Sequence, residues 1–534
     1  MVTIVSALAA LCSGICLYAA FPSYELSLLA WVALTPLLFV LVRSNPLSGF
    51  ILGFLFSAVF FAAHFSWMFV LPGYSVSHHV ILDIYFGILT GILGATISFI
   101  AKRRNDSTAL FAAPFLWVLY EFVRSNLSFL ALPWGLLAHT QFRHPTVIQI
   151  ASLTGAYGVS FLIVFVNAAL AGLFHRYFIL RRKKGPRFIA GTASRGQFLL
   201  PSAAVALVSL SLLFGYLEVH RKSSGERIKI ALIQGNITQD KKWDAAYAQE
   251  IMKIYASLSQ EADAVDPLLI VWPETATPRS ISVDKKVREQ VVRVAESTGA
   301  YVLLGSAQAQ KFNVKDPGKS KYTNSAFLIS PHAGNSKPER YDKIRLLPFG
   351  EYLPYRDRIQ WSVIGIPDIK EYLPGKDYHI LSLAGHNFAV PICWENIFPS
   401  MARTFVLNGA EFIINMTNEA WFGKTAAPYQ FLSMNVLRAA ENRRYVLRCA
   451  NTGISCIIYP YGKILSRVSD EKGNDLFVRG FLTGDITPIQ SKTIYTRFGE
   501  WFVWLCASIA AIVLLMSLLR FIAITPAVAS LPDE

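Results

Sequence analysis

The stretch His386 to Phe398, HNFAVPICWENIF, contains an apolar run that ends directly before Cys393. The run 388–392 is typical of a strand buried in the core of a domain. Packing fixes the backbone of such a strand, so a cysteine at its end, followed by Trp394 and Glu395, is well placed for nucleophilic chemistry. A lone cysteine is more often an inert core residue, because free cysteines are among the most buried residue types. The flanking sequence has to distinguish these two interpretations.

The sequence around this stretch alternates between short β-rich runs and amphipathic helical stretches, which predicts a layered α/β domain. The predicted strands are 228–234, 268–272, 301–304, 325–329, 388–392, 412–416 and 455–459. The predicted helices are 245–262, 285–297, 399–408 and 429–444.

Two other segments of this region carry charged groups that suit a cysteine nucleophile. Glu274 follows the strand predicted at 268–272, and the segment YDKIRLLPFGEY (341–352) contains Lys343 and Glu351. A carboxylate can remove the thiol proton, and an ammonium can stabilise a developing negative charge. Each residue also has a structural interpretation: Glu274 as a surface residue in a proline turn, Lys343 as a solvated charge, and Glu351 as an ion-pair partner.

The rest of the chain is strongly apolar. Charged residues make up 16% of the chain and the mean hydropathy is +0.40, whereas soluble domains carry about 25% charged residues. About eight apolar segments predict membrane-spanning helices, at 2–20, 26–42, 47–71, 80–101, 109–122, 147–174, 198–217 and 501–524. The sequence therefore predicts an N-terminal transmembrane domain at 1–217, an α/β domain at 218–497, and a C-terminal transmembrane helix with a short tail at 498–534.

The basic residues of the predicted loops indicate an orientation by the positive-inside rule. Arg43 lies in the second loop, the run 102–104 in the fourth, and a cluster that includes Arg187 and Arg195 in the sixth, whereas the first and third loops carry no lysine or arginine. Both termini are therefore expected in the cytoplasm and the α/β domain on the outer side of the membrane, which is the periplasm if the cell has an outer membrane. The first apolar segment lacks the basic start of a signal peptide, so we expect it to be retained.

Charge and cysteine content exclude several classes of function. The net charge is +15, but many of the basic residues lie in short clusters between apolar runs and no nucleic-acid-binding signature is present, so no nucleic-acid partner is predicted. None of the six cysteines forms a CxxC pair, and no metal-ligand spacing is found. Cys449 and Cys456 could form a disulfide, although two core thiols are the favoured interpretation. No metal is predicted.

Three blocks of sequence resemble the signature blocks of the nitrilase, or carbon–nitrogen hydrolase, superfamily. They are WPET (272–275), YDKIRLLPFGEYLP (341–354) and VPICWEN (390–396), in that order. With seven predicted spans before the domain and one after it, the chain resembles the apolipoprotein N-acyltransferase family. The segments GNITQDKKW (235–243), NMTNEAWFG (415–423) and RAAENRRYVLRCANTG (438–453) are similar to further blocks of that family. One position departs from it: Trp394 stands where members often have a tyrosine, so that hydroxyl is missing here.

The resemblance implies an αββα sandwich in which Glu274, Lys343 and Cys393 meet. Glu274 would act as general base, Lys343 would stabilise an oxyanion, and Cys393 would carry an acyl group as a thioester. Glu351 would orient Lys343, and Glu395 would either hold its loop or assist proton transfer, two interpretations that the sequence leaves open. This ping-pong cycle needs no cofactor.

The substrates follow partly from location and partly from the resemblance. The periplasm contains no ATP or acyl-CoA, so a membrane phospholipid is the simplest acyl donor, and the resemblance implies a diacylglyceryl lipoprotein as acceptor. Two apolar loops, one with Trp361 and Ile364 and one with Trp421, are hypothesised lids that touch the bilayer; the alternative is that both are buried against their own domain. Trp243 either binds substrate or packs under the site. A monomer is expected.

Two competing functions remain. A membrane-tethered amidase or nitrilase would use the same three residues with water in place of the amine. A transporter or receptor would only bind a ligand in its outer domain, but the spans show no repeat or paired broken helices that would mark a transport site.

Overall fold

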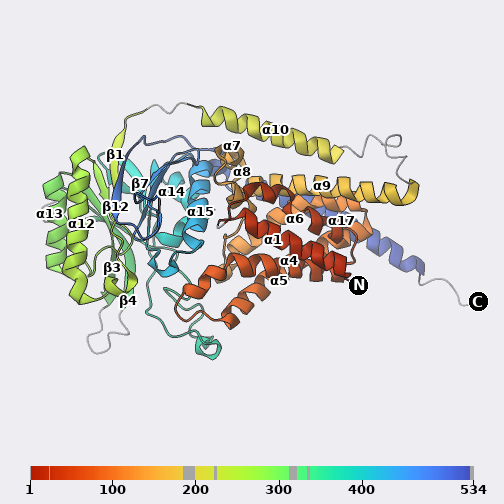
Figure 1. Ribbon diagram of the computed structural model, residues 1–534, viewed down its shortest axis with the longest axis horizontal. Helices are drawn as coiled ribbons and strands as arrows, with labels where there is room; N and C mark the ends of the chain where they lie inside the picture. The colour runs from red at the N-terminus through yellow and green to blue at the C-terminus, as the bar shows by residue number, and fades with distance from the viewer. Residues whose placement is uncertain are drawn as a thin grey trace, which may run out of the picture. The chain divides into compact units, whose positions relative to one another are not determined.

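The computed structural model describes residues 2–22, 24–184, 199–221, 225–311, 321–332 and 337–528 (Figure 1). The chain forms two compact units. The first comprises Met1–Ser66, Tyr74–Glu218 and Glu500–Glu534, and the second comprises Trp67–Gly73 and Val219–Gly499. The segment Trp67–Gly73, which the sequence placed within 1–217, thus groups with the α/β unit, where the Trp67 indole donates a hydrogen bond of 3.0 Å to Gln430.

The first unit is helical. Its helices are α1 (Ile4–Ala20), α2 (Ala30–Ala33), α3 (Thr35–Leu41), α4 (Pro46–His64), α5 (Val76–Arg103), α6 (Asp106–Asn126), α7 (Pro145–Ile148), α8 (Ala151–Thr154), α9 (Ala156–Lys184), α10 (Leu199–Val219) and α17 (Trp501–Val528). Among the described residues, five helices are long and apolar enough to cross a membrane: Pro46–His64, Val76–Arg103, Ala156–Tyr177, Leu199–Val219 and Trp501–Arg520. The predicted spans 2–20 and 26–42 coincide with shorter apolar helices, so the total of about eight spans stays a prediction.

The surface and the contacts of these helices suit a lipid environment. Leu213 and Leu217 of α10 and Leu515 of α17 are each more than half exposed, and such apolar surface is costly in water. Helices α4 and α5 approach each other through glycines: a side chain at Gly53 would collide with the carbonyl of Thr90. Small residues at such crossings are typical of helix pairs in membranes.

Three predicted spans differ from the helices observed. The span predicted at 47–71 ends at His64, where α4 ends. The span predicted at 147–174 is interrupted at Gly155, whose φ of +71° suits glycine, and α9 begins after it. Helix α6 is longer than 109–122 at both ends: the Asn105 side chain caps its start, and near its end the buried Glu121 and Arg124 bind the backbone of the following loop through Leu137 N–H and three carbonyl groups.

The second unit contains two six-stranded sheets. The first has the order β12-β1-β2-β3-β4-β5 and the second has the order β11-β10-β9-β8-β7-β6. The first sheet consists of β1 (Ile228–Gln234), β2 (Leu269–Val271), β3 (Tyr301–Lys311), β4 (Lys321–Ile329), β5 (Glu339–Asp342) and β12 (Gly480–Ile486). The second consists of β6 (Leu381–Leu383), β7 (His386–Ala389), β8 (Phe412–Thr417), β9 (Val446–Ala450), β10 (Cys456–Ile458) and β11 (Ile464–Arg467). In each sheet three neighbouring strands are parallel, β1-β2-β3 and β7-β8-β9.

Helices cover the outer faces of the two sheets, which makes the unit the αββα sandwich that the resemblance implied. Figure 1 shows α12 (Ala248–Ala262) and α13 (Lys285–Thr298) outside the first sheet, and α14 (Pro399–Leu407) and α15 (Ala427–Asn442) beside the second. Between the sheets, the Cys449 thiol contacts the carbonyl oxygens of Ile233 and Val271 at 3.4 and 3.3 Å. Cys449 and Cys456 are separate buried thiols. The structure therefore favours the interpretation as core cysteines over the disulfide.

Candidate active site

Glu274 follows β2 in a backbone position that the neighbouring strand makes possible. A side chain at Gly305 of β3 would lie 2.7 Å from the Glu274 Cα atom, so only glycine permits this approach. The Glu274 carboxylate is buried and accepts hydrogen bonds from Asn324 Nδ2 at 2.7 Å and from the Asn418 backbone N–H at 2.8 Å. Two neutral donors thus hold both oxygens of a carboxylate that the sequence could have placed on the surface.

Lys343 follows β5 and is only 2% exposed. Its Nζ atom lies 2.9 Å from Glu351 Oε1 and 3.8 Å from Glu274 Oε1. Burial alone would lower the pKa of Lys343, but the nearby Glu351, Glu274 and Cys393 outweigh it and raise the pKa above its usual value. Lys343 is therefore a charged ammonium held between two carboxylates, and the interpretation as a solvated charge is wrong.

Cys393 begins the 3-10 turn η11 (Cys393–Ile397), directly after the apolar run 388–392. Only Phe388 and Ala389 of the strand predicted there belong to β7, which begins at His386. Its φ is +56°, a conformation that is rare for a residue with a side chain. The Asn415 side chain holds the turn by donating hydrogen bonds to the carbonyl oxygens of Pro391 and Cys393, at 2.9 and 3.0 Å. Thr417 Oγ1 lies 3.6 Å from Cys393 Sγ. Burial, followed by Glu274, raises the pKa of Cys393 to about 12, and Lys343 and Thr417 oppose this shift.

Glu395 joins the two loops that carry Lys343 and Cys393. Its buried carboxylate accepts hydrogen bonds from the backbone N–H groups of Ile344 at 2.7 Å, Arg345 at 2.9 Å and Ile392 at 2.7 Å. The Tyr341 hydroxyl donates to the same carboxylate at 2.9 Å. Burial raises the pKa of Glu395 to about 7, and the backbone donors at Arg345 and Ile392 oppose that shift. These contacts support a positioning role for Glu395, one of the two interpretations that the sequence had left open, and the role stays a prediction.

Trp394 is also engaged with its own loop. Its side chain is buried, its indole N–H donates to the Arg345 carbonyl at 2.8 Å, and its ring packs edge-on against Phe398 with ring centres 5.0 Å apart. The residue that replaces the expected tyrosine therefore ties the Cys393 turn to the Lys343 loop.

The other predicted binding residues lie at the surface of this unit. Trp243 is 51% exposed, Ile364 41% and Trp421 45%. Trp361 is half-buried, and its indole donates to the Pro354 carbonyl at 2.6 Å. Trp243 is thus not packed under the site, and the loops with Ile364 and Trp421 are not buried against their own unit. Whether these side chains contact substrate or lipid stays a prediction.

Sequence reasoning missed three kinds of group in the cluster. Asn324 donates to both Glu274 and Glu351, Asn415 and Thr417 contact Cys393, and Lys242 donates to the Glu274 carbonyl at 3.0 Å. Lys242 and Asn415 stand inside blocks that resembled the family, and this was the available signal. In the described part of the chain, no three His, Cys, Asp or Glu side chains are grouped so that they could hold a metal ion.

An αββα sandwich with a buried glutamate, lysine and cysteine at its strand ends defines a carbon–nitrogen hydrolase domain. Residues 229–487 match the carbon–nitrogen hydrolase family, and residues 13–169 match the apolipoprotein N-acyltransferase N-terminal domain. An amidase of the nitrilase superfamily from Nesterenkonia AN1 shares 16% identity, with a TM-score of 0.36 over 50% of this chain and 92% of the amidase.

Proteins that are similar to this chain over nearly its full length identify its family within the superfamily. The chain is 34% identical over 524 residues to the apolipoprotein N-acyltransferase of Geobacter metallireducens, which covers 96% of this chain and 95% of that protein. It is 29% identical to that of Nitrosomonas europaea, over 96% of this chain and 97% of that protein. The chain therefore belongs to the apolipoprotein N-acyltransferase family, acyltransferases of the carbon–nitrogen hydrolase superfamily.

Proposed function

We propose that this chain transfers a fatty acyl group from a membrane phospholipid, through a thioester on Cys393, to the α-amine of the N-terminal S-diacylglyceryl cysteine of an apolipoprotein. The observation that carries the proposal is the buried cluster of Glu274, Lys343 and Cys393 in a chain of this family. Apolar helices long enough to cross a membrane support the choice of a lipid as donor.

In the first half-reaction Glu274 takes the thiol proton while Cys393 Sγ attacks the ester carbonyl carbon of the phospholipid. Because the pKa of Cys393 is raised to about 12, hardly any thiolate exists at neutral pH without this base. The carbonyl oxygen becomes an oxyanion, and the Lys343 ammonium stabilises it, with an effect that is typically about 3–4 kcal/mol for one such donor. When the C–O bond breaks, Glu274 returns the proton to the leaving alkoxide, and a lysophospholipid departs.

In the second half-reaction the lipoprotein amine attacks the thioester carbon. Glu274 takes a proton from the attacking nitrogen, the C–S bond breaks, and the proton passes to the Cys393 sulfur, which leaves an amide and the free thiol. Glu351 accepts a hydrogen bond from Lys343 at 2.9 Å, which keeps the Lys343 ammonium charged and oriented. The cycle uses only side chains of this site.

The proposed setting is a bacterial inner membrane. The membrane domain is assigned to 1–217 and 498–534, with both termini in the cytoplasm, and the catalytic domain 218–497 is assigned to the periplasm. The alternation of basic loops supports this orientation, although Arg187 and Arg195 lie outside the described residues. The exposed Ile364 and Trp421 support loops that touch lipid and guide acyl chains.

Mass spectrometry of the purified protein incubated with phospholipid alone tests the acyl-enzyme directly. The expected result is the mass of one acyl chain on the peptide that contains Cys393, and its absence in Glu274→Ala. Adding a diacylglyceryl peptide should then discharge the thioester and yield N-acyl product. Release of free fatty acid with no N-acyl product would instead support the hydrolase alternative, and an unmodified Cys393 in active protein would contradict the mechanism.

A further inference from the structure

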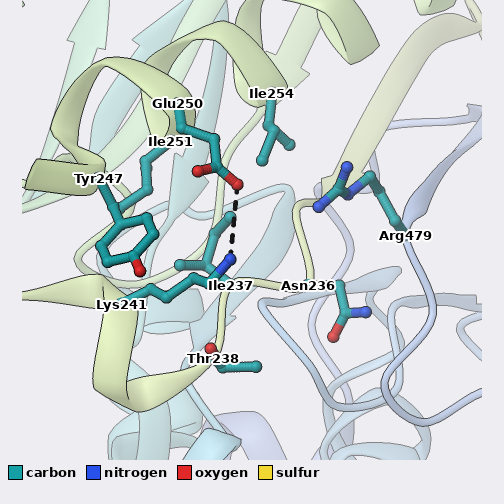
Figure 2. A pocket seen from close by; sticks show the side chains of 9 residues that line it. All are labelled: Asn236, Ile237, Thr238, Lys241, Tyr247, Glu250, Ile251, Ile254 and Arg479. Atoms are coloured by element: carbon teal, nitrogen blue, oxygen red, sulfur yellow. Dashed lines mark ion pairs between the residues drawn. The ribbon is translucent and has the colours of Figure 1, made fainter.

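Two consecutive lysines in the short helix α11 (Gln239–Lys242) have opposite environments. The Lys241 side chain is 42% exposed, and its ammonium lies 3.7 Å from Glu250 Oε1. Figure 2 shows this pair on the wall of a cavity of about 220 Å³ that Tyr247 and Arg479 also line. Lys242 is only 3% exposed, and its ammonium donates a hydrogen bond of 3.0 Å to the Glu274 carbonyl. The first lysine is a surface charge, and the second belongs to the surroundings of the active site.

Lys242 is a buried cation without an adjacent carboxylate. Within the described ranges, no carboxylate oxygen lies within 4.0 Å of its ammonium. Burial lowers the pKa of Lys242 to about 8, and the two titratable groups that oppose this shift are Glu274 and Cys393. Burying an ammonium without a paired carboxylate costs stability, which suggests that the charge of Lys242 has a use in the site.

The charge balance of the site gives that use. Without Lys242 the ion-paired cluster holds two carboxylates, Glu274 and Glu351, and one ammonium, Lys343. Glu395 lies outside this cluster, because its carboxylate is held by backbone N–H groups and the Tyr341 hydroxyl. Moving the thiol proton to Glu274 leaves the cluster equally negative, because the thiolate replaces the carboxylate. A second ammonium makes the cluster neutral both before and after that proton transfer, which reduces the cost of a buried anion.

We propose that Lys242 is a second cation of the active site, which positions Glu274 through its carbonyl oxygen and balances the negative charge that forms when Cys393 loses its proton. The inference rests on the proposed function, because it assigns Lys242 to the step in which that thiol attacks an acyl donor. It predicts that the charge of Lys242, and not only its side-chain volume, determines the reactivity of Cys393.

The experiment measures alkylation of Cys393 by iodoacetamide between pH 6 and 10, by peptide mass spectrometry, in full-length protein. Lys242→Met keeps the aliphatic stem and removes the charge, Lys242→Arg keeps the charge, and Lys241→Met is the matched control. We expect Lys242→Met to lower the alkylation rate at pH 7.5 by roughly tenfold, which is one pKa unit of the thiol. Lys242→Arg should recover most of the rate, and Lys241→Met should stay within about twofold of the unmodified protein.

Equal alkylation profiles for Lys242→Met and the unmodified protein would overturn the proposal. If Lys242→Met does not fold, Lys242→Gln takes its place, and Lys242→Arg must still shift the profile less than the neutral variant does. Alkylation needs no lipid, so it also tests Lys242 if phospholipid fails to acylate the protein. In that case the proposed function is contradicted, and the alkylation rates alone decide whether Lys242 acts as the second cation.

Discussion

The turn that carries Cys393 and the loop 355–366, which follows the segment of Lys343 and Glu351, are held in opposite ways. In the turn, the fully buried Glu395 accepts hydrogen bonds from three backbone N–H groups and a tyrosine hydroxyl. In the loop, Val363 is 77% and Tyr355 52% exposed. The Arg356 side chain of this loop makes an ion pair with Asp368 that is open to solvent.

This difference between the turn and the loop corresponds to two requirements of an acyltransferase: fixed reacting atoms and access for long acyl chains. Reacting atoms need positions fixed by buried, charge-assisted hydrogen bonds, each typically worth about 1.5–3 kcal/mol. A surface that admits long acyl chains needs apolar area and freedom to open, and an exposed ion pair contributes only about 0–1 kcal/mol to holding it. Changes in the turn should therefore abolish chemistry, whereas changes in the loop should act on the substrate.

Removal of the nucleophile should have the largest effect. Cys393→Ala is expected to lower acyl transfer by about 10⁴-fold or more, because it removes the thiol that carries the acyl chain in the proposed mechanism. The measurement is N-acyl peptide formed from phospholipid and a diacylglyceryl peptide. Cys456→Ala, at a buried thiol in β10, is the matched control and should retain activity. Transfer that persists in Cys393→Ala would place the chemistry elsewhere.

Lys343→Met should have the second-largest effect. We expect the acylation rate to fall by about 10²- to 10³-fold, since one preorganised donor to the oxyanion is removed. The substitution also leaves Glu351 and Glu274 without their shared cation. Single-turnover acylation of Cys393 measures the effect. An unchanged rate in a folded variant would mean that another group stabilises the oxyanion.

Glu395→Gln tests the positioning role. The glutamine amide has only one oxygen acceptor, whereas the carboxylate has two. One of the backbone N–H groups that now bind Glu395 would therefore face the NH₂ group of the glutamine, and such a buried mismatch costs about 1–3 kcal/mol. We expect a lower midpoint of thermal unfolding and a loss of activity of about 10- to 100-fold. Glu395→Ala should be at least as severe; full activity in both variants would refute the role.

The stability of the unmodified protein should also depend on pH through Glu395. Its pKa is about 7 in the folded protein and about 4.3 in an unfolded chain, so the native state binds this proton more tightly. The stabilising contribution is therefore complete below about pH 4 and is lost as the pH rises through about 7. Comparing thermal unfolding of the unmodified protein and Glu395→Gln at pH 5 and pH 8 isolates this contribution; a parallel pH dependence would contradict it.

Much of the sandwich could be predicted from sequence because most of its central strands are continuous apolar runs. The strand predicted at 228–234 coincides with β1, and the helix predicted at 399–408 ends one residue beyond α14. The strands missed lack that pattern. β9 contains Arg448, whose charge is neutralised by a buried ion pair with Glu419 that no local pattern reveals. β12 contains two glycines and an aspartate, which are depleted in strands, and is held by pairing with distant β1.

The order of the blocks indicated Glu274, Lys343 and Cys393, but not the groups that hold them. Asn324 in β4 and Asn418 directly after β8 bind Glu274 from positions distant in sequence, and only the tertiary fold brings them together. Lys242 was missed because lysine is rarely buried, and its neighbour Lys241 is of the same type but exposed. Sequence alone does not tell such neighbours apart.

The loop should give a smaller and more selective effect. Val363→Glu and Ile364→Glu are expected to lower transfer from long-chain phospholipids by about 3- to 30-fold, because a charge must then leave the lipid surface. A water-soluble short-chain thioester donor should be used as before. Val283→Glu, at a valine that is 74% exposed, is the matched control. Equal loss with both donors would mean that the loop affects the site and not lipid access.

The smallest effect is expected at Trp394, where the chain departs from the tyrosine common in its family. The Trp394 ring is buried and bonded to the Arg345 carbonyl, so its contribution here is to packing within the turn. Trp394→Phe and Trp394→Tyr should both stay within about threefold of full activity and unfold slightly earlier, since one hydrogen bond of about 1 kcal/mol is lost. The two variants differ by one hydroxyl. If the tyrosine variant were at least tenfold faster than the phenylalanine variant, the hydroxyl would have a role in the chemistry. The unmodified chain, with Trp394, would then carry out the reaction without that hydroxyl.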